Sequence, residues 1–162
     1  MLAQDSPAPD FTLLNHDGQE TSLGFLLERG PLVLYFYPAD FTPLCTAEAC
    51  SFRDTFADPA LQEVGLSLSG ISPQSVASHA KFREKHDLTF PLLADTEKKV
   101  ARAYDALLPF GLGTRRVTYL IDPNRTIVDG VEANLGLGKH NAFIERAIEH
   151  ARAAAGTGSR GS

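Results

Sequence analysis

Sulfur is scarce in this chain, which has only two cysteines, Cys45 and Cys50, among its 162 residues. A structural zinc site usually needs four cysteine or histidine ligands, and the five histidines are scattered at positions 16, 79, 86, 140 and 150. The spacing of the cysteines also differs from the Cys-x-x-Cys pattern, in which the two sulfurs meet without moving a helix. The sequence therefore predicts no metal site.

An excess of positive charge and long apolar runs are lacking as well. With 15 basic and 20 acidic residues the net charge is -5, so no overall field attracts nucleic acid or an anionic membrane. The longest apolar run, near residues 31–37, is too short to span a bilayer, and the N-terminus lacks the pattern of a secretory signal. We therefore expect a cytoplasmic protein with no nucleic-acid or membrane partner. Thiols stay reduced in that compartment, which favours reactive over structural cysteines.

The remaining composition is that of a globular protein. Hydrophobic residues make up 43% and charged residues 22%, and the length suffices to bury a core without disulfide or metal support. We expect one domain over residues 1–152. The small and polar residues that follow predict a disordered tail over residues 153–162.

The hydrophobic pattern predicts an α/β fold with a mixed sheet flanked by helices. Over residues 9–23, apolar and polar residues alternate on either side of Asp17-Gly18, a dipeptide typical of hairpin turns, so we expect a hairpin. The dense apolar run 31–37 predicts a strand buried on both faces. Further strands are expected at 64–72, 90–95, 116–122 and 126–131, and helices at 44–56, 74–86, 96–104 and 139–153. Val76, Ala80 and Phe82 give the second helix a partial apolar stripe, and Phe143, Ala147, Ile148 and Ala151 do so for the last.

Cys45 lies where chemistry is usual in an α/β sheet, at the point where the loop after a strand enters a helix. Thr42 is a candidate N-cap and Pro43 a typical first helical residue, so the helix is expected to begin at about Cys45. A thiolate there is stabilised by the helix dipole and by free backbone N–H groups. Cys45 is therefore the candidate nucleophile, whereas Cys50, more than one turn further on, should stay a thiol until its partner is oxidised.

The spacing of the two cysteines has a mechanical consequence. Five helical residues separate their Cα atoms by roughly 8 to 9 Å, and a disulfide tolerates at most about 7 Å. The two sulfurs can therefore bond only if the start of the helix unwinds. Alternatives remain open at this point: both cysteines can be small buried hydrophobes, Thr42 can be a cap alone, and Pro38 and Pro43 can simply end a strand and start a helix.

Residues 37–50, YPADFTPLCTAEAC, resemble the peroxiredoxin active-site signature Pro-x-x-x-Thr-x-x-Cys, carried here by Pro38, Thr42 and Cys45. A second cysteine five residues later is similar to the bacterioferritin-comigratory or Q branch of that family. The resemblance covers roughly residues 5–150. It implies a thioredoxin-like fold with an N-terminal β-hairpin and a thiol-dependent peroxidase that reduces hydrogen peroxide and organic hydroperoxides without a cofactor.

The resemblance also implies roles for single residues. Cys45 would be the peroxidatic cysteine, Cys50 the resolving cysteine, and Thr42 the hydroxyl that holds peroxide and thiolate. Pro38 would shield the site from water. An active-site arginine is expected from the strand at 116–122, and we assign it to Arg116.

Three further residues lie close in the chain to the assigned ones. Arg115 and Arg116 point to opposite faces of a strand, so only one of them can face the site. Glu48 matches an acidic position of the family, although a glutamate early in a helix is also ordinary helix electrostatics. Leu44 departs from the branch, which usually has glycine before the reactive cysteine, and adds bulk beside the pocket.

The resemblance implies a hydroperoxide substrate, thioredoxin or a similar dithiol as the reductant, and a monomer, with a dimer as the alternative. Two other functions are compatible with the residues. One is a thiol-disulfide oxidoreductase with little peroxidase activity. The other is a redox-sensing interaction module whose cysteines do not catalyse turnover.

Overall fold

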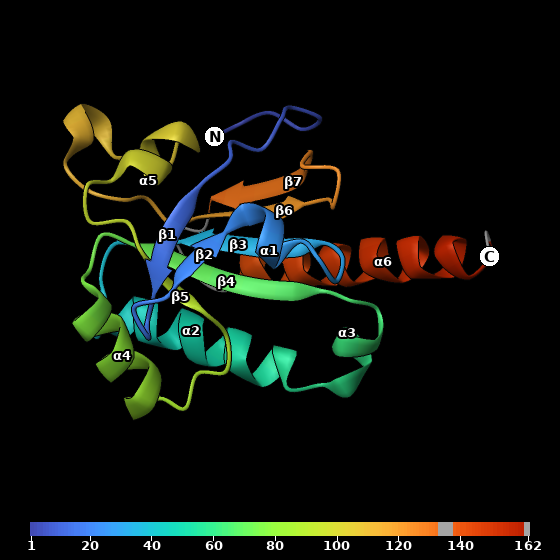
Figure 1. The fold of residues 1–162 in the computed structure, drawn as a ribbon, viewed down its shortest axis with the longest axis horizontal. Coiled ribbons are helices and arrows are strands. Elements are labelled where there is room, and N and C mark those ends of the chain that lie inside the picture. The colour runs from blue at the N-terminus through green and yellow to red at the C-terminus, as the bar shows by residue number, and fades with distance from the viewer. Residues whose placement is uncertain (133–137, 161–162) are drawn as a thin grey trace.

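A computed structural model describes residues 1–132 and 138–160. Its described strands form one seven-stranded mixed sheet in the order β2-β1-β5-β4-β3-β6-β7 (Figure 1). The strands are β1 (Thr12–Asn15), β2 (Glu20–Ser22), β3 (Leu32–Phe36), β4 (Ser67–Ser72), β5 (Leu92–Ala94), β6 (Val117–Ile121) and β7 (Ile127–Glu132). The α/β class and the mixed sheet are thereby confirmed. So is the N-terminal hairpin of β1 and β2, whose turn places Gly18 at a φ of 77°.

The described helices are α1 (Leu23–Leu26), α2 (Pro43–Phe56), α3 (Pro59–Glu63), α4 (Val76–Lys85), α5 (Lys99–Ala103), the 3-10 helix η1 (Pro109–Gly111) and α6 (Gly138–Arg160). Three of these, α1, α3 and η1, were not predicted, and α1 and η1, with four and three residues, are too short to show a helical period. The start of α3 nevertheless has a signal in the sequence. Asp58 caps it by accepting the N–H of Ala60, and Pro59 is its first residue.

β3 is buried on both faces, as its sequence predicts. Leu32, Leu34 and Phe36 belong to one hydrophobic cluster, which α1 and α5 cover. The alternate residues Val33 and Tyr35 belong to the second cluster, which α2, α4 and α6 cover. Figure 1 shows α5 above the sheet and α2 and α4 below it. Because side chains alternate across a strand, one five-residue strand contributes to both halves of the core.

The sheet topology brings residues that are distant in the chain to the carboxyl ends of the parallel strands. β3 and β4 run parallel, as do β4 and β5, so their carboxyl ends lie together where α2 and α4 begin. β6 runs antiparallel to β3, with Tyr35 opposite Thr118. Arg116, which directly precedes β6, therefore lies beyond the carboxyl end of β3, at the same end of the sheet as Cys45.

Two helices differ from their predicted form. In α4 the buried side chains are His79 and Phe82, whereas Ala80, predicted to join an apolar stripe, is exposed. α6 buries Phe143, Ala147 and Ala151 as expected, and Ile144 joins them. It continues to Arg160, into the segment predicted to be a disordered tail, and a run of alanines at 153–155 favours that continuation. Residues 161 and 162 of the tail lie outside the described residues.

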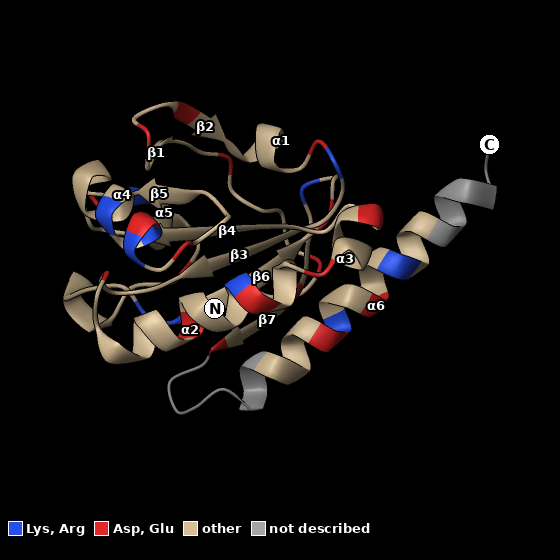
Figure 2. Ribbon diagram, turned by 90° about the horizontal axis from the view of Figure 1, so that it is seen from below, with Lys and Arg blue, Asp and Glu red and all other residues tan. Residues whose placement is uncertain are grey.

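The described surface is polar along its outer helices. Figure 2 shows Lys and Arg interleaved with Asp and Glu along α4 and α6. Across the described residues, no helix combines the length and the apolar character needed to cross a membrane.

Candidate active site

Cys45 is buried at the start of α2. It is the third residue of the helix, which begins at Pro43, two residues earlier than predicted, and its side chain is 1% exposed. The first intrahelical bond runs from the N–H of Thr46 to the carbonyl of Thr42, at 2.8 Å. The N–H groups of the first turn therefore have no partner within the helix. A thiolate at Cys45 would lie in the favourable field of the helix N-terminus.

Arg116 lies against the cysteine sulfur. Its Nη1 is 3.0 Å from Cys45 Sγ, and the guanidinium can donate only, so the sulfur accepts. The neighbouring Arg115 points elsewhere: its Nη2 donates to the carbonyl of Asp105 at 2.7 Å, and its Nε is 3.3 Å from a carboxylate oxygen of Glu132. The geometry thus brings one of the two adjacent arginines to the site, and it is the one that we assigned.

Thr42 and Pro38 belong to the loop that joins β3 to α2. The Thr42 hydroxyl donates to the carbonyl of Ala39 at 3.1 Å, and Thr42 is the N-cap by position without a side-chain capping bond. A hydroxyl oxygen has two acceptor lone pairs, so Thr42 can still accept a hydrogen bond from the O–H of a bound hydroperoxide. Pro38 is partly buried two residues beyond the end of β3.

Cys50 occupies the same helix, one and a half turns further on. α2 is continuous from Pro43 to Phe56, and both cysteines are free thiols. Cys50 is partly exposed, in contrast to Cys45. An unbroken helix of this geometry keeps the two Cα atoms farther apart than a disulfide allows.

Glu48 and Leu44 differ sharply in burial. Glu48, one turn beyond Cys45, is 4% exposed, which does not fit the alternative of a surface glutamate serving helix electrostatics alone. Leu44, which directly precedes Cys45, is 39% exposed, and Phe41 is 44% exposed on the other side of Thr42. These two exposed apolar side chains flank Thr42 in the chain, and we call them the apolar rim.

Tyr35 of β3 packs against the buried face of α2. Its ring packs 4.6 Å from the ring of Phe52 between centroids, and its buried hydroxyl has no hydrogen-bond partner among the described residues. Burial, followed by the nearby charges of Glu48 and Cys45, raises the pKa of Tyr35 well above its ordinary value, so it stays protonated. The opposite residue on β4 is Gly70, where an added Cβ would lie 2.8 Å from the tyrosine ring.

The sequence reasoning missed a buried polar cluster behind the loop. Asp40 accepts hydrogen bonds from Tyr37, at 2.6 Å, from Ser78, at 2.7 Å, and from the Nδ1 of His79, at 2.8 Å. Burial by itself would raise the pKa of Asp40, but the bonds from His79, Tyr37 and Ser78 outweigh it and hold the pKa below its ordinary value. A histidine on a helix face of mixed polarity gives no sequence signal for such a partner.

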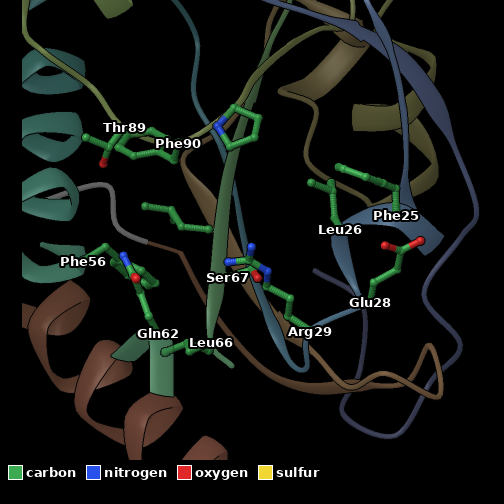
Figure 3. Close-up of a pocket in the computed structure, with 12 residues that line it drawn as sticks. Phe25, Leu26, Glu28, Arg29, Phe56, Gln62, Leu66, Ser67, Thr89 and Phe90 are labelled. Atoms are coloured by element: carbon green, nitrogen blue, oxygen red, sulfur yellow. The ribbon is translucent and has the colours of Figure 1, made fainter. Parts of the chain in front are cut away.

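A separate pocket lies at the opposite end of the parallel strands, where they begin. Its lining includes Arg29, just before β3, Ser67 at the start of β4, and Phe90 just before β5. Figure 3 shows Thr89 and Phe90 on one side of it and Phe25 and Leu26 on the other. None of the predicted site residues lines it, and it faces the amino ends of the parallel strands, where α/β chemistry is unusual. Among the residues that the structure describes, no group of three or more potential metal ligands is arranged around a common point.

A mixed sheet covered by helices, with a buried free cysteine where a central strand leads into a helix, defines the class of thioredoxin-like thiol proteins. Comparison with known proteins narrows this class. Residues 5–129 match the family model described as the AhpC/TSA family. The chain therefore belongs to the AhpC/TSA family.

Individual relatives carry the names peroxiredoxin Q and Bcp. A chloroplastic peroxiredoxin Q of Oryza sativa subsp. japonica is 40% identical over 127 residues, which are 78% of this chain but 57% of that protein. The chain thus spans little more than half the length of the rice relative.

Two solved structures extend the similarity to the fold. Peroxidoxin BcpB from Mycobacterium tuberculosis has a TM-score of 0.83 and 34% identity, covering 94% of this chain and 98% of that one. The bacterioferritin comigratory protein of Xanthomonas campestris, whose structures concern its alkyl peroxide reduction activity, has a TM-score of 0.78 and 31% identity, covering 87% and 92%. These two matches establish the thioredoxin-like peroxiredoxin fold for this chain.

Proposed function

We propose that this chain is a thiol-dependent peroxidase that reduces hydrogen peroxide and organic hydroperoxides. The observation that carries the proposal is the 3.0 Å contact between Arg116 Nη1 and Cys45 Sγ at the start of α2. A guanidinium and a helix N-terminus both favour the thiolate, which is the nucleophilic form of cysteine. The alkyl peroxide activity named for the Xanthomonas relative supports the same substrate class.

In the first step the Cys45 thiolate attacks the terminal oxygen of the hydroperoxide. The S–O bond forms as the O–O bond breaks, so sulfur is oxidised to a sulfenic acid and the leaving alkoxide or hydroxide takes a proton to become alcohol or water. Arg116 and the backbone N–H of Cys45 would donate to the charge as it moves from sulfur to oxygen. Thr42 would accept a hydrogen bond from the peroxide O–H, and Pro38 would keep water from the sulfur.

The apolar rim bears on the choice of peroxide. Leu44 and Phe41 expose apolar side chains beside Thr42. An alkyl group that extends outward from a bound hydroperoxide would contact this rim and remove apolar surface from water. We therefore include alkyl hydroperoxides among the substrates.

In the second step the start of α2 unwinds and Cys50 reaches Cys45. The Cys50 sulfur attacks the sulfenic sulfur, a disulfide forms, and the hydroxyl leaves as water with the thiol proton. The partial exposure of Cys50 supports this role, since little core packing holds it in place. The step needs unwinding because the intact helix keeps the two sulfurs apart.

In the third step a dithiol reductant restores both thiols by exchange through a mixed disulfide and becomes a disulfide itself. The balance over one cycle is hydroperoxide plus dithiol giving alcohol, water and disulfide. Thioredoxin is the reductant that we propose, acting on a monomer in a reducing compartment such as the cytoplasm.

The test is peroxide consumption with a thioredoxin system, by the unaltered protein and by Cys45→Ser. We expect turnover with hydrogen peroxide and with tert-butyl hydroperoxide, and its loss in the variant. A thiol-disulfide oxidoreductase would instead reduce disulfides while consuming peroxide no faster than a free thiol. An interaction module would bind its partner equally well with Cys45→Ser. Either of these results would overturn the proposal.

A further inference from the structure

A buried hydrogen-bonded cluster ties the active-site loop to three other elements. The cluster consists of Tyr37, Asp40, Ser72, Ser78 and His79, and we call it the Asp40 cluster. The side chains of Asp40 and His79 have no exposed surface and lie 2.8 Å apart. Asp40 belongs to the loop between β3 and α2, five residues before Cys45, while its partners Ser78 and His79 belong to α4.

His79 extends the connection to the sheet. Its Nε2 lies 3.1 Å from the carbonyl oxygen of Leu93 on β5 and 3.3 Å from the hydroxyl of Ser72 at the end of β4. The Nδ1 on the other side of the ring lies 2.8 Å from the Asp40 carboxylate. The imidazole ring therefore lies between the loop carboxylate and β5 and links the two.

The next residue of the loop is held on the same helix face. Phe41 has a φ of 65°, a left-handed conformation that a residue with a bulky side chain rarely adopts. Its ring packs edge to face on Phe82, with 5.1 Å between centroids. His79 and Phe82 are the buried residues of α4, so the buried face of this helix contacts the active-site loop. Such conformations persist only where the surroundings fix them.

We propose that Asp40 and His79 are positioning residues for the peroxide reaction. By holding the loop in place, they set Pro38, Thr42 and the first turn of α2 around Cys45. The inference rests on the proposed function, because it assigns these residues to the oxidation step of that reaction. The Asp40 cluster also anchors the loop that precedes the segment expected to unwind afterwards.

The first test uses two single variants, Asp40→Asn and Ser78→Ala. Asp40→Asn keeps the shape but removes the carboxylate, and Ser78→Ala removes one of its three donors. Misplacing reacting groups by about 1 Å can cost on the order of 100-fold in rate. We expect Asp40→Asn to slow single-turnover oxidation by hydrogen peroxide by roughly 10- to 100-fold and Ser78→Ala to slow it less. Disulfide formation, which follows release of α2, should not be slowed in either variant.

The matched control is Ser75→Ala. Ser75 caps the same helix by accepting the N–H of Ser78 and does not contact Asp40. The variant lowers the stability of α4 while leaving the Asp40 cluster complete. Its oxidation rate should equal that of the unaltered protein, whereas a merely structural role for Asp40 would slow both variants in proportion to the stability that each loses.

A second pair of variants separates the two bonds of His79. Asparagine places its amide near the position of Nδ1 and can still donate to Asp40, whereas glutamine places it near Nε2 and can donate only to Leu93. We therefore expect hydrogen peroxide to oxidise Cys45 several-fold faster in His79→Asn than in His79→Gln. This comparison decides the proposal even if Asp40→Asn does not fold.

Three results would overturn the inference: Asp40→Asn as fast as the unaltered protein, Ser75→Ala slowed as much as Asp40→Asn, or His79→Asn and His79→Gln equally impaired. The proposed function fails on a different observation. In that case the unaltered protein itself would react with hydrogen peroxide no faster than a free thiol.

Discussion

Arg116 Nη1 lies 3.0 Å from Cys45 Sγ, although 71 positions separate the two residues in the chain. The contact arises because β6 runs antiparallel to β3, so the start of β6 lies beside the carboxyl end of β3. In the proposed reaction, a guanidinium in this position would stabilise negative charge on sulfur before the attack and on oxygen during it.

Arg116→Met removes this donor. Removing one donor that faces a developing oxyanion typically costs on the order of 100-fold in rate, and we expect a loss of that size in the second-order oxidation of Cys45 by hydrogen peroxide. Stopped-flow fluorescence or competition with a reference peroxidase measures it. Arg115→Met is the matched control, because the adjacent side chain contacts Asp105 and Glu132 instead. Equal losses in the two variants would contradict the assignment of Arg116.

Cys50→Ser separates oxidation from resolution. Cys45 should still react with hydrogen peroxide at the unaltered rate, because the attacking sulfur and its donors are unchanged. The product should be a protein one oxygen atom heavier, with a sulfenic acid that dimedone traps, and turnover with thioredoxin should be lost. Full thioredoxin-dependent turnover by Cys50→Ser would exclude the resolving role.

Leu44→Gly tests the unwinding step. Glycine in a helix costs roughly 0.5–1 kcal/mol relative to a good helix former, which shifts the unwinding of the first turn by roughly two- to fivefold. Disulfide formation after oxidation should therefore accelerate by about that factor, with little change in the reaction with hydrogen peroxide. Leu44→Ala, which trims the side chain but keeps helix propensity, is the control. Equal acceleration of disulfide formation in Leu44→Ala and Leu44→Gly would assign the effect to side-chain bulk instead.

Asp40 should contribute to stability in a pH-dependent way. Its folded-state pKa is held below the ordinary value by the bonds from His79, Tyr37 and Ser78, against the effect of burial. Such a carboxylate stabilises the fold above its unfolded pKa of about 4, and this contribution is lost as the pH falls through the folded pKa. In urea titrations the difference in free energy of unfolding between the unaltered protein and Asp40→Asn should narrow as the pH falls from about 5 to below about 4. A difference that stays constant over that range would show that the charge of Asp40 does not stabilise the fold.

Much of the fold could be predicted from local pattern. The run 31–37 has apolar residues on both faces, and β3 supplies both core clusters. The Thr42-Pro43 pair marked the start of α2 to within two residues. These signals depend on neighbours in the chain, which is why a single sequence contains them.

The contacts between distant residues could not be predicted in the same way. Asp40 and His79 are 39 positions apart, and His79 gave no sign of burial because its helix face mixes polar and apolar residues. The pairing of β1 with β5 likewise depends on a long-range choice of partner that no local pattern encodes. For Arg116 it was the family resemblance that supplied the assignment, since strand alternation alone leaves Arg115 as an equal candidate.

The most direct test of the account is stopped-flow oxidation of the fully reduced protein by one equivalent of hydrogen peroxide at pH 7, followed by peptide mapping of the product. The account predicts a second-order rate orders of magnitude above that of free cysteine. It also predicts that the product contains a disulfide between Cys45 and Cys50. A rate equal to that of free cysteine would contradict it.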